Sequence, residues 1–167
     1  MYWSECGKQA AIETAAMDGT KRRTLVGQNL YWPVGLTIDY PANRLYWIDS
    51  KLRLVESVKL DGTSRKMVHQ FPAGNKSGFH LLRPIRTALL NRFADMKPFK
   101  VDVFEDYLYV AMHQNNTVVR LNKFGFYGVS TLEAGLTRIS DLVIYQENKQ
   151  YVSGRVCEIH ALVTSKL

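Results

Sequence analysis

The chain has 167 residues, 46% of them hydrophobic and 22% charged, a balance typical of a folded globular protein and not of a disordered one. The formal net charge is +7, but the basic residues are scattered and no nucleic-acid-binding motif accompanies them, so we expect no nucleic-acid partner. No run approaches the roughly 18 apolar residues of a membrane span. The sequence shows no charged leader followed by an apolar core, so it predicts no signal peptide.

Two landmarks recur along the first part of the chain. Tyr2-Trp3 returns as Tyr46-Trp47, a step of 44 residues, and the turn sequence Asp18-Gly19-Thr20 returns as Asp61-Gly62-Thr63, a step of 43. The features between these landmarks also follow one another in the same order. A period of this size is typical of a β-propeller, in which one blade of four short strands takes about 40–45 residues.

The middle copy of the repeat predicts four strands, at residues 35–40, 45–49, 54–60 and 65–69. Turn residues separate them, in Pro41-Ala42-Asn43 and Asp61-Gly62, where Asn and Gly tolerate the positive φ of tight hairpins. A single four-stranded sheet cannot bury both of its faces. Stacking against neighbouring sheets would bury them, which accounts for both the repetition and the aromatic content.

The repeat is interrupted and then resumes. Residues 74–96 form an insertion, in which residues 87–96 show a weak helical pattern of apolar residues. We interpret it as a surface insertion between blades, with a binding loop or a segment that disturbs the fold as alternatives. A third copy follows, with Asp102 and Tyr109 in the places of Asp39 and Tyr46. Residues 139–144 are typical of the opening strand of a fourth copy.

From Trp32 to Leu52 the sequence reads W-P-V-G-L-T-I-D-Y-P-A-N-R-L-Y-W-I-D-S-K-L. This segment resembles the YWTD repeat of the low-density lipoprotein receptor family. Residues 97–110, 122–125 and 140–150 resemble the closing blades of its large endocytic receptor-related members. The resemblance implies an all-β fold, a partial six-bladed YWTD β-propeller with about three of the six blades. In that family the last part of the propeller returns to complete the first blade.

The same resemblance divides the chain into four parts. Residues 1–73 would form one partial and one complete blade, and residues 74–96 the inserted loop, with a short helix as one option. Residues 97–150 would form a further blade and the opening strand of the next. Residues 151–167 would be a degenerate tail where an EGF-like module begins. Motif residues would stabilise the blades; they are Tyr2, Trp3, Asp39, Tyr46, Trp47, Asp49, Asp102 and Tyr109.

The first copy departs from the family pattern Tyr-Trp-Thr-Asp-Trp-Gly at Ser4, Glu5 and Cys6. Cysteine in place of the second tryptophan removes a large surface between blades. Cys157 stands where the resemblance places the first cysteine of an EGF-like module. A disulfide between Cys6 and Cys157 is a further option, which rests only on the absence of other cysteines in the chain.

Asp39, Asp49 and Asp102 recur in successive copies, whereas a catalytic site is needed only once. We therefore interpret them as hydrogen-bonding residues and not as an acid–base pair. The four histidines show no metal-ligand spacing, and no nucleophile elbow, P-loop or dinucleotide-binding motif occurs. We predict no enzyme activity, no catalytic residue, no metal and no cofactor. Asn75 and Asn115 begin N-glycosylation triplets.

Together these features predict an extracellular propeller segment of an endocytic lipoprotein-receptor-like protein, on the outer face of a membrane receptor or secreted. The segment would bind protein ligands and position adjacent EGF-like or ligand-binding modules of the parent receptor, without direct membrane contact. Two alternatives are a truncated product without independent function and a six-bladed propeller hydrolase. Because about three blades expose faces and strand edges that a closed ring would bury, we expect poor solubility of the isolated chain.

Overall fold

The computed structural model describes residues 1–71, 97–113, 116–125, 128–145 and 160–164, the last of these as backbone only. These residues form four antiparallel sheets and no helix. The first sheet contains β1 (Tyr2–Glu5), β2 (Ala11–Thr14) and β3 (Arg23–Val26). The second contains β4 (Pro33–Asp39), β5 (Arg44–Asp49), β6 (Leu54–Lys59) and β7 (Lys66–Gln70). The third contains β8 (Pro98–Phe104), β9 (Tyr107–Met112), β10 (Thr117–Asn122) and β11 (Ser130–Glu133), and the fourth pairs β12 (Asp141–Tyr145) with β13 (His160–Thr164).

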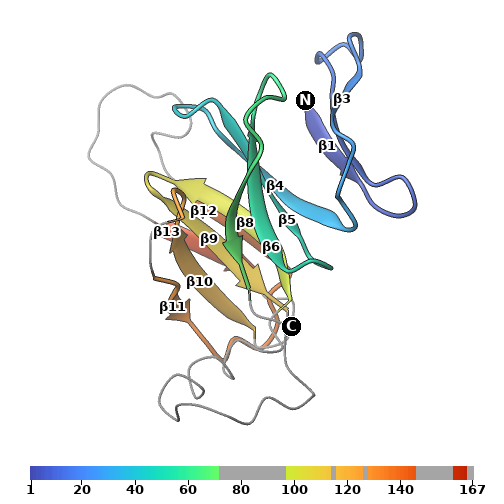
Figure 1. Ribbon diagram of the computed structural model, residues 1–167. Coiled ribbons are helices and arrows are strands. Elements are labelled where there is room, and N and C mark those ends of the chain that lie inside the picture. Colours follow the sequence, from blue (N-terminus) through green and yellow to red (C-terminus); the bar gives the residue numbers. More distant parts are fainter. Residues whose placement is uncertain (72–96, 114–115, 126–127, 146–159, 165–167) are drawn as a thin grey trace, which may run out of the picture.

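The all-β fold predicted from the sequence is confirmed, and all four strands predicted for the middle copy are present. The predicted insertion and its helical pattern at residues 87–96 lie outside the described residues. Of the predicted tail, the structure describes residues 160–164, which pair with β12 as a strand. The sheets follow one another in space as they do along the chain, with β4–β7 between β1–β3 and β8–β11 (Figure 1).

The recurring turn sequence has the same geometry in both copies. The backbone N–H and the hydroxyl of Thr20 donate to Asp18 Oδ1 at 2.9 and 2.7 Å, and those of Thr63 donate to Asp61 Oδ1, both at 2.7 Å. The bonds from threonine lower the pKa of both carboxyls. Each turn closes the hairpin between the last two strands of its sheet, so the repeat seen in sequence is also a structural repeat.

Strand β5 shows why the sheets stack. Its side chains point alternately to the two faces of the sheet, as in any β-strand. Leu45 and Trp47 pack against the first sheet, whereas Tyr46 and Ile48 pack against the third. The third sheet packs against Tyr46 and Ile48 with one face. Tyr109 of β9 lies on its other face and packs against β12. Each complete sheet is therefore buried on both faces, as in consecutive propeller blades.

The second and third sheets approach each other closely at Gly35, in a bulge of β4. Its φ is +59°, and a Cβ placed there would lie 2.9 Å from Lys100 Cα of β8. We expect Gly35→Ala to lower the free energy of unfolding by about 3 kcal/mol, from backbone strain and overpacking together. Urea denaturation measures the loss.

Gly19→Ala is the matched control for this change, because Gly19 also has a positive φ of 82° but nothing lies within 4 Å of its added Cβ. The control therefore loses only the conformational part. Equal losses for the two variants would show that the approach of β4 to β8 does not require glycine.

Candidate functional site

An aromatic surface lies at the end of the second sheet where β4 begins. The linker between β3 and β4 carries Tyr31 and Trp32, whose exposed fractions are 48% and 52%. The β5–β6 turn lies at the same end because neighbouring strands are antiparallel. It contributes Lys51, whose Nζ lies 5.0 Å from the centre of the Tyr31 ring, within the range of a cation–π contact. We call Tyr31, Trp32 and Lys51 the aromatic platform.

The buried carboxylate of Asp49 holds this platform together. Its Oδ2 accepts hydrogen bonds from the backbone N–H groups of Tyr31 at 2.7 Å and Trp32 at 3.2 Å. Its Oδ1 accepts from the N–H groups of Lys51 at 3.1 Å and Leu52 at 2.9 Å. One side chain with no exposed surface thus satisfies four backbone donors in two loops, which fixes the loops relative to each other.

A second contact joins the same linker to the outer strands of its sheet. Trp47 lies opposite Glu56 in the β5–β6 ladder, and the Arg65 guanidinium lies 5.5 Å from the centre of the Trp47 ring. Arg65 makes a bidentate pair with Glu56 at 2.6 and 3.0 Å. It also donates to the carbonyl oxygens of Gln28 at 2.6 Å and Asn29 at 3.0 Å. The Trp–Glu–Arg triad therefore ties the linker to its sheet.

The first sheet contains the same triad in an exposed setting. Trp3 lies opposite Glu13, and the Arg22 guanidinium pairs with Glu13 and lies 5.2 Å from the centre of the Trp3 ring. A second ion pair, of 3.2 Å, joins Arg22 to Glu5. The Arg22 side chain is 59% exposed, against 25% for Arg65, because in the described structure no linker lies over it.

Glu13, Arg22, Glu56 and Arg65 were not predicted as site residues. A signal was present, since Glu13 and Glu56 are 43 residues apart, as are Arg22 and Arg65. That step equals the spacing of the Asp-Gly-Thr turns. The sequence alone did not show that each Glu–Arg pair lies beside a tryptophan of the neighbouring strand.

The other two recurrent carboxylates join neighbouring sheets. Asp39 Oδ2 lies 2.9 Å from Nζ of Lys123, and both side chains are buried. Asp102 accepts the Thr37 hydroxyl on Oδ1 at 2.9 Å and the Ile144 N–H on Oδ2 at 2.7 Å. Asp102 of the third sheet thereby contacts both the second and the fourth sheet. Lys123, the partner of Asp39, was not among the predicted residues.

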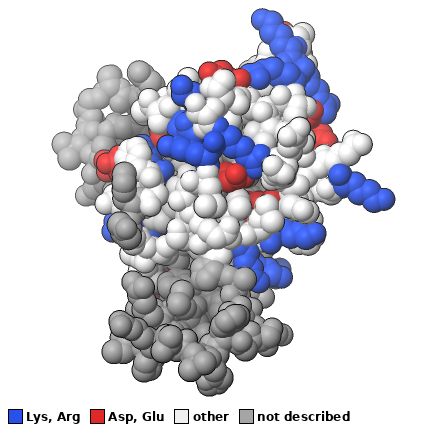
Figure 2. Space-filling model, viewed as in Figure 1, with Lys and Arg blue, Asp and Glu red and all other residues white. Residues whose placement is uncertain are grey.

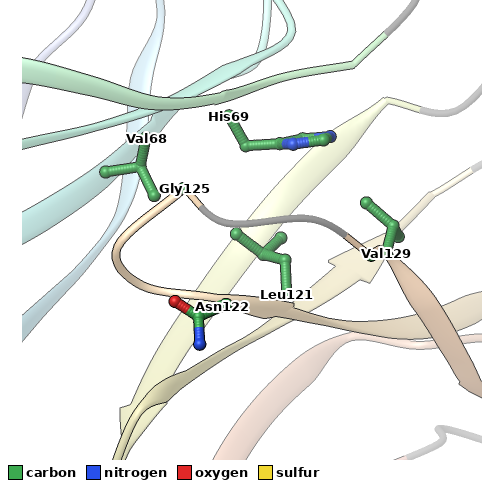
Figure 3. Close-up of a pocket in the computed structure, with 7 residues that line it drawn as sticks. Val68, His69, Leu121, Asn122, Gly125 and Val129 are labelled. Atoms are coloured by element: carbon green, nitrogen blue, oxygen red, sulfur yellow. The ribbon is translucent and has the colours of Figure 1, made fainter.

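A cleft of about 230 Å³ separates the outer parts of the second and third sheets. It lies between β7 and the turn that follows β10 (Figure 3), and the labelled residues around it are Val68, His69, Leu121, Asn122, Gly125 and Val129. The His69 ring meets the Phe71 ring edge to face, with 4.6 Å between their centres. Burial lowers the pKa of His69.

The lowered pKa of His69 predicts a pH-dependent stability. The unfolded chain binds this proton below the ordinary histidine pKa of about 6.5, whereas the folded chain binds it only at lower pH. The free energy of unfolding should therefore fall as the pH decreases below about 6.5. Urea midpoints at pH 7.5 and pH 5.5 measure the change, and His69→Gln should reduce it. An unchanged dependence in that variant would assign the effect to other groups.

Several predicted residues fall outside the described part of the chain. These are the glycosylation candidates Asn75 and Asn115 and the second cysteine, Cys157. Cys6 is exposed, with Sγ 3.4 Å from the carbonyl oxygen of Pro33. Because Cys157 is not among the described residues, its pairing with Cys6 stays a prediction. The described residues contain no group of three or more His, Cys, Asp or Glu placed to hold a metal ion.

The described part of the chain also contains no helix of the length and apolarity needed to cross a membrane. Lys and Arg side chains form several separate groups on the face shown in Figure 2, without one continuous basic surface. This distribution agrees with the scattered basic residues of the sequence.

Stacked antiparallel sheets, with a Tyr-Trp pair on β1 of the first sheet and another on β5 of the second, define a segment of a YWTD β-propeller. Residues 1–40 and 43–70 match the model of the low-density lipoprotein receptor repeat class B. The chain therefore carries low-density lipoprotein receptor class B repeats, and the resemblance found at Trp32–Leu52 is confirmed.

Relatives in sequence include two vitellogenin receptors. The chain is 38% identical to the vitellogenin receptor of Solenopsis invicta over 124 residues, which are 74% of this chain and 6% of that protein. It is 30% identical to the vitellogenin receptor Yl of Drosophila melanogaster over 158 residues, which are 95% of this chain and 7% of that protein. The chain is thus a homologue of these receptors that spans a small part of their length.

Two solved structures share the fold. A chain in a nidogen/laminin complex superposes with a TM-score of 0.56 at 24% identity, over 80% of this chain and 41% of that one. A luciferin-regenerating enzyme superposes with the same TM-score at 14% identity, over 80% of this chain and 39% of that one. Both likenesses concern the fold alone.

Proposed function

We propose that this chain is an extracellular, non-catalytic propeller segment of an endocytic receptor, and that it binds a protein ligand on the aromatic platform. The observation that carries the proposal is the pair of exposed rings of Tyr31 and Trp32, held by the buried Asp49 carboxylate. The segment would also position adjacent EGF-like or ligand-binding modules of its parent protein. The receptor homologues support this assignment.

The chemistry of the platform suits a protein partner. Tyr and Trp are enriched among the few residues that carry most of the binding energy of protein interfaces. Four backbone hydrogen bonds to Asp49 fix the two loops before binding. Less conformational entropy is then lost on association, which favours affinity. The names of the receptor homologues point to a vitellogenin as the ligand.

Surface plasmon resonance with the full chain immobilised and purified vitellogenin of Solenopsis invicta in solution tests the proposal. Trp32→Ala should raise the Kd by about 30-fold, the effect of losing one interface hot spot. Tyr40→Ala is the matched control, since Tyr40 is an exposed aromatic residue just beyond the opposite end of β4. Equal effects of the two variants, or no binding by the wild-type chain, would contradict the proposal.

A further inference from the structure

The end of the molecule that carries the aromatic platform also carries three exposed lysines. Strand directions place the β1–β2 turn, the β5–β6 turn and the start of β8 at this end. Each of these segments contributes one of the lysines, which are Lys8, Lys51 and Lys97. We call them the lysine rim. The β1–β2 turn lies beside the start of β4, because Cys6 Sγ is 3.4 Å from the carbonyl oxygen of Pro33.

Lys97 takes in the third sheet the place that Trp32 has in the second. Each of the two residues directly precedes the proline that begins its inner strand, β4 or β8. The carbonyl oxygen of each accepts the backbone N–H of the residue after the second strand, Ser50 or His113, at 3.0 Å. Because β4 and β8 are neighbouring strands, the lysine rim continues from the platform onto the next sheet.

The carboxylates near the rim are already engaged. Asp49 is buried and accepts four backbone N–H groups. Glu5 pairs with Arg22 at 3.2 Å, and Asp141 pairs with a lysine of β8 at 2.9 Å. Glu133 lies on the outermost strand of the third sheet. No ion pair within the described residues includes a rim lysine.

The opposite end of the same sheets carries exposed charges of both signs. Its turns contain Asp18 and Lys21 in the first sheet, Lys59 and Asp61 in the second, and Glu105 and Asp106 in the third. The unpaired positive charge is therefore a property of the platform end and does not follow from the overall composition alone.

Lys51 brings this charge onto the platform itself. Its Nζ lies 5.0 Å from the centre of the Tyr31 ring, so an approaching cation would be repelled there and an approaching carboxylate attracted. The Trp32 ring, with 52% of the residue exposed, offers an apolar surface beside it. The site thus combines an apolar seat with positive charge around it.

We propose that the ligand segment that covers the aromatic platform is acidic. Its Asp and Glu side chains pair with the lysine rim, on both sides of an apolar side chain that lies on the Trp32 ring. This inference rests on the function proposed above and names the chemistry of the ligand. Exposed ion pairs each add little affinity, but complementary charge speeds association and selects among partners.

Two peptides of equal size test the proposal with the full chain immobilised for surface plasmon resonance. One is acidic, Glu-Asp-Phe-Asp-Glu, and the other carries the matching amides, Gln-Asn-Phe-Asn-Gln. The acidic peptide should bind about 30-fold more tightly in 50 mM NaCl, since each of three exposed ion pairs contributes about threefold. Trp32→Ala should weaken its binding further, because the phenylalanine loses its seat.

Lys51→Glu should raise the Kd of the acidic peptide about tenfold, since one attraction is replaced by a repulsion. The variant keeps the backbone N–H that Asp49 binds. Lys59→Glu is the matched control, because it makes the same change in net charge at an exposed lysine on the opposite end of the same sheet. The control should stay within about twofold of the wild type, and circular dichroism confirms that both variants keep their sheet content.

The same surface with vitellogenin of Solenopsis invicta in solution connects the chemistry to a protein ligand. Its Kd should rise about tenfold between 50 and 500 mM NaCl, mainly through slower association, because salt screens exposed charges. Phosphatase treatment of the vitellogenin should leave this dependence unchanged. Its loss on treatment would assign the anionic groups to phosphates and overturn the assignment to carboxylates.

The outcomes separate this inference from the function on which it rests. Equal affinities of the two peptides, or equal effects of Lys51→Glu and Lys59→Glu, would overturn the acidic ligand. A vitellogenin complex that depends on Trp32 but not on Lys51 or salt would overturn it too and leave the proposed function standing. Binding of the acidic peptide without binding of vitellogenin would support the inference and contradict vitellogenin as the ligand.

Discussion

Asp49→Ala is expected to lower the free energy of unfolding by about 4 kcal/mol. The carboxylate accepts four backbone N–H groups, from Tyr31, Trp32, Lys51 and Leu52, and each donor that loses its partner costs about 1 kcal/mol or more. Urea denaturation measures the loss. Hydrogen exchange should accelerate at these four amides before it accelerates elsewhere, because the linker and the β5–β6 turn are released together.

Asp49→Asn is the matched control for this variant. Its carbonyl oxygen accepts from one of the two loops, whereas its NH₂ group faces the N–H donors of the other. About half of the loss should remain, with fast exchange in one loop only. A loss below about 1 kcal/mol for Asp49→Ala would show that water replaces the carboxylate and that the platform does not depend on it.

Lys123→Met is expected to lower the free energy of unfolding by about 3–5 kcal/mol. The change leaves the Asp39 carboxylate buried, with 5% of its side chain exposed, and without its ammonium partner. Loss of one member of a buried ion pair costs this much, since the remaining charge is uncompensated. Thermal or urea denaturation measures the loss, and the second and third sheets should separate more readily because the pair joins them.

The double variant Asp39→Asn/Lys123→Met separates the ion pair from simple packing. It removes both charges and keeps an oxygen that accepts the Ala42 N–H, which Asp39 binds at 3.1 Å. The double variant should be more stable than Lys123→Met alone, so a double-mutant cycle should give a coupling energy of about 1–3 kcal/mol. Additive losses would show that the two charges do not stabilise the contact between sheets.

Local pattern was sufficient to predict the strands of the second sheet. Short apolar runs within residues 33–70, such as Leu45–Ile48, are separated by turn residues, of which Asn43 and Gly62 adopt the positive φ that the hairpins require. These preferences act over a few residues, so sequence shows them directly. The repeat also predicted that the sheets stack, because a recurring blade must pack against its neighbours to bury its faces.

The contacts of the candidate site were less predictable, since they join residues far apart in the chain. Asp39 and Lys123 are 84 positions apart, and no spacing rule connects a strand end in one copy to a turn in the next. Trp32 presented a similar difficulty. Tryptophan is usually buried in a core, and only the structure shows that the bond from the Trp32 backbone N–H to Asp49 holds this one at the surface.

The sequence by itself determined the class of fold, the family of repeats and the recurrence of Tyr2-Trp3 at Tyr46-Trp47. Side-chain alternation and turn chemistry are local properties, and the 43-residue step repeats them. Only the tertiary structure decided which faces of the sheets are buried, which carboxylate organises the platform, and that Arg22 lies open where Arg65 is covered. Those features depend on which sheets become neighbours, and stacking brings together residues that no local interaction connects.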